Sequence, residues 1–203
     1  MSLPPSYFDE LYAACPDPWG FAERSYEARK RALTLACLPD AWYARAFEPG
    51  CSIGLLTEAL AGRCGILLAT DVSVAAVQQA SERLGGASHV RVEQLAVPAG
   101  WPAGRFDLIV LSEVGYYLDA DDAVRLADRA VLGLEPAGAL IAVHWRHPVA
   151  DYPLSGDRVH DILAERAGRA GLHPLVRHQE IDLLLDVWSP DPRSVAERSG
   201  LPS

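Results

Sequence analysis

Short apolar runs alternate along the chain with segments in which apolar residues recur at helical spacing. The runs are almost continuously apolar, as expected for parallel strands that are covered on both faces. They lie at residues 44–48, 65–71, 90–95, 106–112 and 139–145. Strands that alternate with helices predict right-handed βαβ units, and hence a doubly wound α/β fold with a mostly parallel sheet.

The helical pattern is clearest at residues 121–134, where Val124, Leu126, Ala127, Ala130, Val131 and Leu134 share one face. Acidic residues precede this segment, and such residues favour a helix N-terminus. Similar patterns predict helices at 54–63, 73–84 and 158–170. Residues 135–138, Glu-Pro-Ala-Gly, predict a turn before the last of the five strands.

Both ends of the chain depart from this alternation. Residues 6–14 and 26–38 predict two helices that end at prolines, and we expect residues 1–40 to form a helical arm or lid. Residues 41–188 would form the core of a single domain, with 175–187 as a closing antiparallel pair of strands. The prolines in residues 189–203 predict a loose tail.

Composition narrows the classes of partner. The chain has 203 residues, 50% of them hydrophobic, and a formal net charge of −9, which argues against nucleic acid or an anionic membrane as a partner. No apolar run approaches the ~18 residues of a membrane span, and residues 1–8 do not resemble a secretory signal. The four cysteines have no metal-ligand spacing, so we expect no metal site and buried or half-buried free thiols in a reducing cytoplasm.

The strongest motif follows the first predicted strand. Glu48, Gly50, Ser52 and Gly54 give the pattern E-x-G-x-S-x-G, in which glycines allow a tight turn and close approach of a ligand. Asp71 ends the second strand, where a carboxylate can accept both hydroxyls of a ribose. Together they predict a nucleoside-ligand site. The alternative is that the glycines only shape the turn and that Asp71 caps the next helix.

In these residues the chain resembles the class I S-adenosylmethionine-dependent methyltransferases. The resemblance covers about residues 43–146 and includes Phe-Asp-Leu-Ile-Val at 106–110 and Pro-Ala-Gly at 136–138. It implies a Rossmann-like fold with seven strands and an N-terminal helical lid, and S-adenosyl-L-methionine as the cofactor. The implied cofactor-binding residues are Glu48, Gly50, Ser52, Gly54, Asp71, Leu95, Ala96, Ser112 and Trp19.

The sequence departs from that family after the third strand. Many members carry an acidic residue there that binds the adenine amine, whereas this chain has Leu95, Ala96 and Val97. The adenine would therefore be held by backbone groups and apolar contact.

A narrower resemblance is to the NodS-type methyltransferases. It is carried by residues 7–9, 17–21, 48–54, 111–118, 144–146 and 156–160. Those bacterial enzymes N-methylate the free amine of a deacetylated chitooligosaccharide. The resemblance therefore implies a cytoplasmic bacterial enzyme with a small-molecule or oligosaccharide acceptor that bears an amine. Another small amine-bearing molecule remains an alternative acceptor.

Glu113 and His144 follow the fourth and fifth strands, at the sheet edge where ligands bind in open α/β folds. A protonated amine cannot accept a methyl group, so a nearby base would assist the transfer, and these two residues are the predicted catalytic groups. The alternative roles are structural. Glu113 would then pair with an arginine such as Arg146 or cap a turn, and His144 would be a hydrogen-bonded buried histidine.

Aromatic residues provide candidates for the remaining contacts. Tyr116, Tyr117, Trp145 and Arg146 are the predicted acceptor-binding residues. Trp19 could lie close to the sulfonium, where cation–π attraction contributes ~0.5–2 kcal/mol, or could attach the N-terminal arm to the sheet. Glu27 and Lys30, the only lysine of the chain, are interpreted as ordinary helix surface.

Two other functions compete with methyl transfer. A nicotinamide-dependent oxidoreductase would carry G-x-G-x-x-G, which this turn lacks. A non-catalytic S-adenosylmethionine-binding protein would bind the cofactor without turnover, and Glu113 and His144 argue against it. The sequence does not decide between monomer and dimer.

Overall fold

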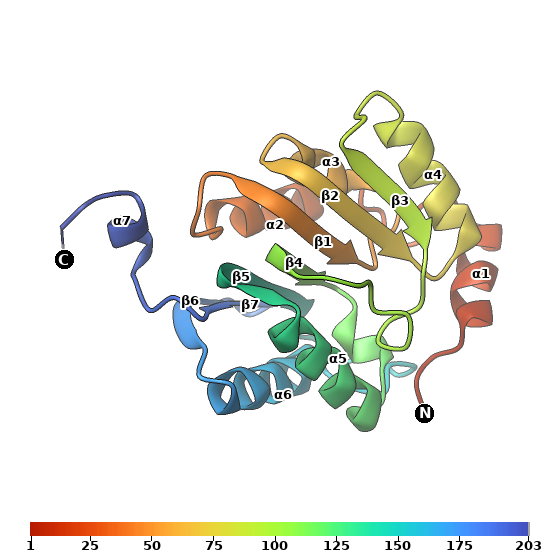
Figure 1. Cartoon of the computed structure of the whole chain (residues 1–203). Helices are drawn as coiled ribbons and strands as arrows, with labels where there is room; N and C mark the ends of the chain where they lie inside the picture. The colour runs from red at the N-terminus through yellow and green to blue at the C-terminus, as the bar shows by residue number, and fades with distance from the viewer. Residues whose placement is uncertain (203) are drawn as a thin grey trace.

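The computed structural model describes residues 1–202, which form a seven-stranded sheet covered by helices (Figure 1). The strands are β1 (Tyr43–Pro49), β2 (Cys64–Asp71), β3 (Val90–Gln94), β4 (Phe106–Ser112), β5 (Leu134–Trp145), β6 (His173–Gln179) and β7 (Leu183–Ser189). Their order is β3-β2-β1-β4-β5-β7-β6. Strands β1 to β5 pair in parallel, and β7 is antiparallel to both neighbours. The predicted doubly wound α/β fold is confirmed.

Helices cover both faces of the sheet (Figure 1). They are α1 (Pro5–Ala14), α2 (Ser25–Ala36), α3 (Leu55–Ala61), α4 (Val74–Leu84), α5 (Ala120–Leu132), α6 (Gly156–Arg169) and α7 (Val195–Arg198), with a 3-10 turn, η1, at Gly115–Tyr117. In β4, Leu108 and Val110 pack with residues of α2 and α3, while Ile109 and Leu111 pack with residues of α5 and α6. Both faces are buried, which explains why residues 108–111 of this strand are all apolar.

The turn predicted at residues 135–138 lies inside β5. Leu134 already pairs with Phe106 of β4, and the next pair is Ala139 with Leu108. The four residues between them therefore form a bulge opposite Asp107, in which Pro136 needs no ladder hydrogen bond. The closing antiparallel pair is present as β6 and β7, with β7 inserted between β5 and β6.

The segment after Ser189 differs from the predicted loose tail. It contains α7, which begins at a capping box formed by Ser194 and Glu197. The side chain of Arg198 is 2% exposed and donates to Asp40 at 2.9 Å and to Ser189 Oγ at 2.6 Å. Hydrogen bonds from a buried guanidinium thus attach the tail up to Arg198, a contact that no local pattern predicts.

The strand order reverses between β1 and β4, and the carboxyl ends of these strands face a crevice. The N-terminal arm crosses this edge: α1 lies beside α4, and the preceding residues reach the α5 side (Figure 1). The backbone N–H of Leu3 donates to the Tyr117 carbonyl at 2.8 Å. The fold thus brings the arm, the β1 turn and the β4 loop together.

Candidate active site

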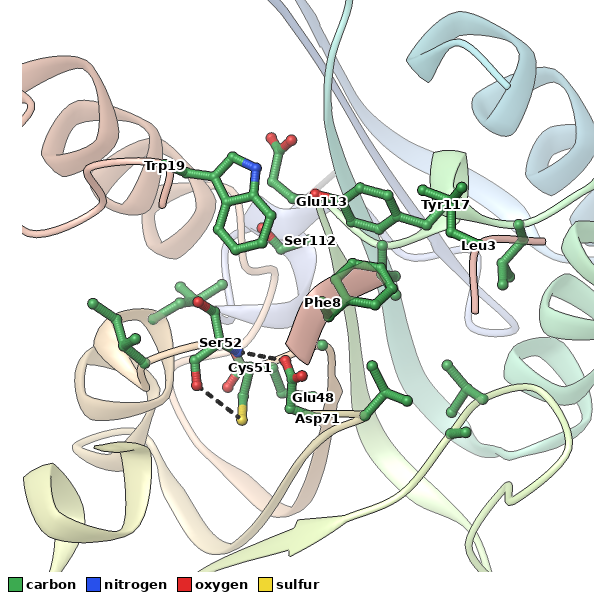
Figure 2. A pocket seen from close by; sticks show the side chains of 18 of the residues that line it. Leu3, Phe8, Trp19, Glu48, Cys51, Ser52, Asp71, Ser112, Glu113 and Tyr117 are labelled. Carbon is green, nitrogen blue, oxygen red and sulfur yellow. Dashed lines mark hydrogen bonds between the residues drawn. The ribbon is translucent and has the colours of Figure 1, made fainter. Parts of the chain in front are cut away.

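A pocket of about 260 Å³ lies at this edge, between the carboxyl ends of β1, β2 and β4 and the N-terminal arm. Figure 2 shows Asp71 and Glu113 at separate ends of it. The predicted residues that line it are Trp19, Glu48, Gly50, Ser52, Asp71, Leu95, Ala96, Ser112, Glu113 and Tyr117. The predicted residues outside the lining are Gly54, Tyr116, His144, Trp145 and Arg146.

The turn after β1 has three residues with left-handed backbone: Gly50 at φ 75°, Ser52 at φ 50° and Gly54 at φ 80°. Ser52 therefore adopts the conformation that glycine adopts most easily. Its hydroxyl lies 2.5 Å from the hydroxyl of Tyr12 in α1, which connects the turn to the arm. A Cβ at Gly54 would lie 3.0 Å from the Cβ of Ala80, so this glycine allows the turn to pack against α4.

The Asp71 carboxylate is held by two backbone donors. Oδ2 accepts from the Ser52 N–H at 2.9 Å, and Oδ1 accepts from the Ser73 N–H at 3.0 Å. Burial raises the pKa of Asp71, and these hydrogen bonds only partly offset that shift. Asp71 therefore orders the start of α4, as the alternative interpretation expected, and it also presents its carboxylate to the pocket.

Glu48 is a buried carboxyl group with one oxygen free. Its side chain lines the pocket, and Oε2 has no hydrogen-bond partner among the described residues. Burial raises the pKa of Glu48 to about 8. A buried polar atom without a partner is costly, so this oxygen indicates a place for a ligand that donates a hydrogen bond or carries positive charge.

Part of the pocket lining is apolar. Leu95, Ala96 and Val97, which follow β3, form one wall, and Leu3 of the arm also lines the pocket. Asp122, near the start of α5, adds a carboxylate that accepts from Ser2 Oγ at 2.5 Å.

Glu113 directly follows β4 and has a left-handed backbone, with φ 58°. Its Oε1 lies 2.9 Å from Lys30 Nζ, which is also 2.8 Å from Glu27 Oε2. Its other oxygen accepts from the Tyr116 hydroxyl and, at 3.4 Å, from the Trp145 N–H. Glu113 is therefore the centre of a hydrogen-bonded cluster at the pocket.

The interpretation of Glu27 and Lys30 as ordinary helix surface is wrong. They are 7% and 5% exposed and line the pocket, because α2 turns this face towards the end of β4. Burial lowers the pKa of Lys30, but Glu113 and Glu27 raise it by more, so the net pKa lies above its ordinary value. One buried ammonium is thus shared by two carboxylates. The sequence signal that could have found it is that Lys30 is the only lysine.

Aromatic side chains from the arm cover the pocket. Phe8 contacts Tyr117 edge-on at 4.9 Å, and Trp19 stacks on Phe21 at 5.5 Å. The Trp19 indole N–H donates to the Tyr152 hydroxyl at 3.4 Å. Figure 2 shows Trp19, Phe8 and Tyr117 around the pocket. Trp19 therefore attaches the arm and also forms part of the pocket wall.

His144 does not reach the pocket, which corrects its predicted catalytic role. It is 0% exposed, and its Nε2 accepts from the Gly115 N–H at 3.1 Å. Because β5 side chains alternate between faces, His144 points into the layer beneath α6 rather than into the crevice. This is the alternative that the sequence left open, a hydrogen-bonded buried histidine.

Three of the four predicted acceptor contacts, Tyr116, Trp145 and Arg146, also lie outside the pocket lining, whereas Tyr117 belongs to it. The Tyr116 hydroxyl is used by Glu113, and the Trp145 ring packs edge-on against Tyr26 at 5.4 Å. The Arg146 guanidinium pairs with Asp157 at 2.9 Å. The partner of Glu113 is therefore Lys30 rather than Arg146.

Over residues 1–202, no group of three or more histidine, cysteine or acidic side chains is arranged to hold a metal ion. Cys51 and Cys64 are buried and Cys37 is half-buried, but Cys15 is exposed, unlike the prediction for it. In the same part of the chain, no helix is long and apolar enough to cross a membrane.

Comparisons with known proteins fit this geometry. A family model described as Nodulation protein S (NodS) matches residues 9–151. Nodulation protein S of Rhizobium tropici is 33% identical over 130 residues, which are 63% of this chain and 55% of that protein. The match thus spans about half the length of this curated relative.

Two solved structures are similar over most of the chain. The N-methyltransferase NodS of Bradyrhizobium japonicum WM9, in complex with S-adenosyl-L-homocysteine, has a TM-score of 0.81 and 27% identity, over 92% of this chain and 99% of that one. A crystal structure from Pseudomonas syringae, provisionally described as a methyltransferase, is 51% identical with a TM-score of 0.72. It covers 82% of this chain and 99% of that one.

Proposed function

Since the chain belongs to the Nodulation protein S (NodS) family, we propose that it transfers a methyl group from S-adenosylmethionine to the nitrogen of a small amine-bearing acceptor, an amino sugar of the chitooligosaccharide type. The observation that carries the proposal is a single pocket that brings together the Gly50–Ser52 turn, the Asp71 carboxylate and Glu113.

The residues of the pocket fit S-adenosylmethionine. The unpartnered Glu48 oxygen can accept from the ammonium of the methionine part, and Asp71 can accept from the ribose hydroxyls. Leu95 and Ala96 provide an apolar wall for the adenine. When bound, this group supplies an electrophilic methyl carbon on a sulfonium.

Charge in the pocket favours a cationic cofactor and an amine acceptor. The acidic lining residues with a carboxylate charge near neutral pH are Glu27, Asp71, Glu113 and Asp122, and Glu48, with its raised pKa, is mostly neutral there; the basic ones are Lys30 and Arg31. An excess of carboxylates attracts an ammonium or sulfonium group and repels a carboxylate or phosphate acceptor. This electrostatic preference supports methylation of nitrogen.

Glu113 is the proposed acceptor of the amine's hydrogen bond. A carboxylate there orients the nitrogen lone pair and favours loss of the amine proton before the new C–N bond forms. Lys30 and Tyr116 donate to Glu113 and fix its direction. Phe8, Trp19 and Tyr117 exclude water around the reacting groups, and Tyr117 is the predicted acceptor contact that also lines the pocket.

The test is an assay of methyl transfer with partly deacetylated chitooligosaccharides, beside a panel of small amines, alcohols and carboxylates. We expect S-adenosylhomocysteine together with an N-methylated product whose mass and fragmentation locate the methyl group. The fully acetylated oligosaccharide, which lacks the free amine, is the matched control.

Product on an oxygen would overturn the nitrogen assignment. Transfer to small amines but not to the oligosaccharides would keep the reaction and remove the sugar. Binding of S-adenosylhomocysteine without turnover on any acceptor would favour a non-catalytic binding protein, and a thermal shift with NADH alone would favour an oxidoreductase.

A further inference from the structure

A buried chain of hydrogen bonds connects the loop after β4 to β7. The Gly115 N–H donates to His144 Nε2 at 3.1 Å, and His144 Nδ1 lies 3.1 Å from His160 Nε2. His160 Nδ1 lies 2.7 Å from Asp186 Oδ2. The three side chains come from β5, α6 and β7, and each is less than one tenth exposed.

The geometry fixes where the protons lie. Because the Gly115 N–H is always a donor, His144 Nε2 carries no proton, and the proton of the neutral ring is on Nδ1. His144 Nδ1 therefore donates to His160 Nε2, so the His160 proton is on Nδ1 and is donated to Asp186. Burial lowers the pKa of His144 well below its usual range, in keeping with a neutral ring.

This chain of hydrogen bonds ends at Gly115, in the same loop as Glu113. Gly115 lies two residues after Glu113, and a Cβ there would lie only 2.4 Å from Val159 Cγ1 of α6. The absence of a side chain lets the loop approach α6 closely enough for its N–H to reach His144. Glu113 itself has the strained left-handed backbone noted above, and such a conformation persists only where its surroundings hold it.

None of the three residues lines the pocket, so they cannot contact a ligand bound there. Asp186 lies at the far end, where its other oxygen is 3.7 Å from the exposed Arg177. An aspartate that is hydrogen-bonded to a histidine also occurs in catalytic triads. Here, however, the hydrogen bonds lead to the backbone N–H of Gly115 and not to a nucleophile.

We propose that Asp186, His160 and His144 are positioning residues that hold the loop after β4, and with it Glu113, in the geometry required for methyl transfer. The inference rests on the proposed role of Glu113. The hydrogen-bond chain itself does not depend on that role, and this separation allows the two to be tested independently.

The first measurement is nitrogen-15 NMR of the imidazoles in the wild-type protein, with His144→Gln and His160→Gln used to identify the signals. We expect both rings as the neutral Nδ1–H tautomer, and a Gly115 amide proton shifted by the imidazole acceptor. A ring protonated on Nε2, or a doubly protonated ring at neutral pH, would contradict the proposed order of hydrogen bonds from Gly115 to Asp186, whatever the activity of the enzyme.

The second measurement compares His144→Met with His144→Gln at equal folded fractions. Met fills the space but accepts no hydrogen bond, whereas a Gln carbonyl oxygen lies about where Nε2 does and can accept from Gly115. We expect His144→Met to lower kcat about 10²-fold, the order that a displacement of about 1 Å costs, with an unchanged S-adenosylhomocysteine Kd. His144→Gln should regain most of that kcat.

If both variants lose the same thermal stability and keep the wild-type kcat per folded molecule, the hydrogen bonds from Gly115 to Asp186 have only a structural role, and the proposal is overturned. If the wild-type protein methylates no amine, the proposed function fails, and the tautomers still decide whether the chain exists.

Discussion

Among the described residues other than glycine, Ser52 and Glu113 have left-handed backbones, and both line the pocket. Each is held by polar contacts: Ser52 by Tyr12 and Asp71, and Glu113 by Lys30, Tyr116 and the Trp145 N–H. A strained conformation costs of order 1–3 kcal/mol, and these contacts help to offset that cost.

Asp71→Ala should lower the affinity for S-adenosylhomocysteine at least about tenfold, because hydrogen bonds to a charged group contribute about 1.5–3 kcal/mol each. Calorimetry measures the effect, and circular dichroism checks that the fold persists. Asp161→Ala removes an exposed acid of α6 and is the matched control. An unchanged Kd for Asp71→Ala would remove Asp71 from the binding site.

Glu113→Gln keeps the size of the side chain but removes its charge and most of its basicity. Turnover should fall by roughly 10²-fold, the lower end of what one acid–base group contributes, while cofactor affinity changes little. Raising the pH should recover part of the rate, because more of the acceptor amine is then unprotonated. Normal turnover near neutral pH would contradict the role, and lost cofactor binding would place Glu113 at the methionine end.

The raised pKa of Glu48, about 8 against an ordinary 4.5, predicts how stability depends on pH. Between these values the folded protein holds a proton that the unfolded chain releases, so stability is gained below the lower value and lost as the pH rises through the higher one. Relative to Glu48→Gln, the wild-type free energy of unfolding should fall by up to about 1.4 kcal/mol per pH unit in this window. Urea unfolding at several pH values measures it. A constant difference would mean that Glu48 is ionised in the folded protein.

At the scale of elements, α2 is attached to the end of β4 by one buried ammonium. Lys30 Nζ also lies within 5.7 Å of the Phe21 ring centroid and 5.5 Å of that of Tyr26. The face of α2 that carries Glu27 and Lys30 is part of the pocket lining.

Lys30→Met should destabilise the protein by about 3–5 kcal/mol, because it leaves Glu27 and Glu113 buried without their counter-charge. Adding Glu27→Gln removes the repulsion and should restore part of the stability, as measured by urea unfolding. Arg29→Met, on the same helix but in an exposed ion pair with Glu180, should have a much smaller effect. Equal effects of Lys30→Met and Arg29→Met would contradict the buried pairing.

At the scale of the whole molecule, the N-terminal arm forms one wall of the pocket at the edge of the sheet. Ser2, Leu3, Phe8 and Trp19 all line it, so a ligand in the pocket would contact the arm as well as the sheet edge. The arm is held by a few hydrogen bonds and aromatic contacts, and by a small apolar cluster in which Tyr12 packs with Ile53 and Ala76.

Binding of S-adenosylhomocysteine should therefore slow amide hydrogen exchange in residues 3–21 far more than in β4 and β5. A ligand that binds only the closed form stabilises it by about 2.7 kcal/mol at one hundred times its Kd. Mass spectrometry of peptides with and without ligand measures the difference. Equal protection of arm and sheet, or protection of the sheet alone, would show that the arm does not close over the ligand.

The sequence by itself determined the order of strands and helices, the turn after β1 and the position of Asp71 at the end of β2. These features are local, because each one depends on a short stretch of sequence. They are an apolar run, a turn with regularly spaced glycines and an acidic residue at the end of a strand. The motifs around Glu48, Gly50, Gly54 and Asp71 also carry the family resemblance, which the family match confirms.

Only the tertiary structure decided which side chains share the site. Lys30 and Glu113 are 83 residues apart, and the residues that connect Gly115 to Asp186 come from different elements. Whether His144 faces the crevice or the layer beneath α6, and whether Arg198 is buried, depends on which elements pack together. Whether a charged side chain is buried and which partner it has depend on packing between segments that are far apart in the sequence. The residues next to it in the sequence do not determine that packing.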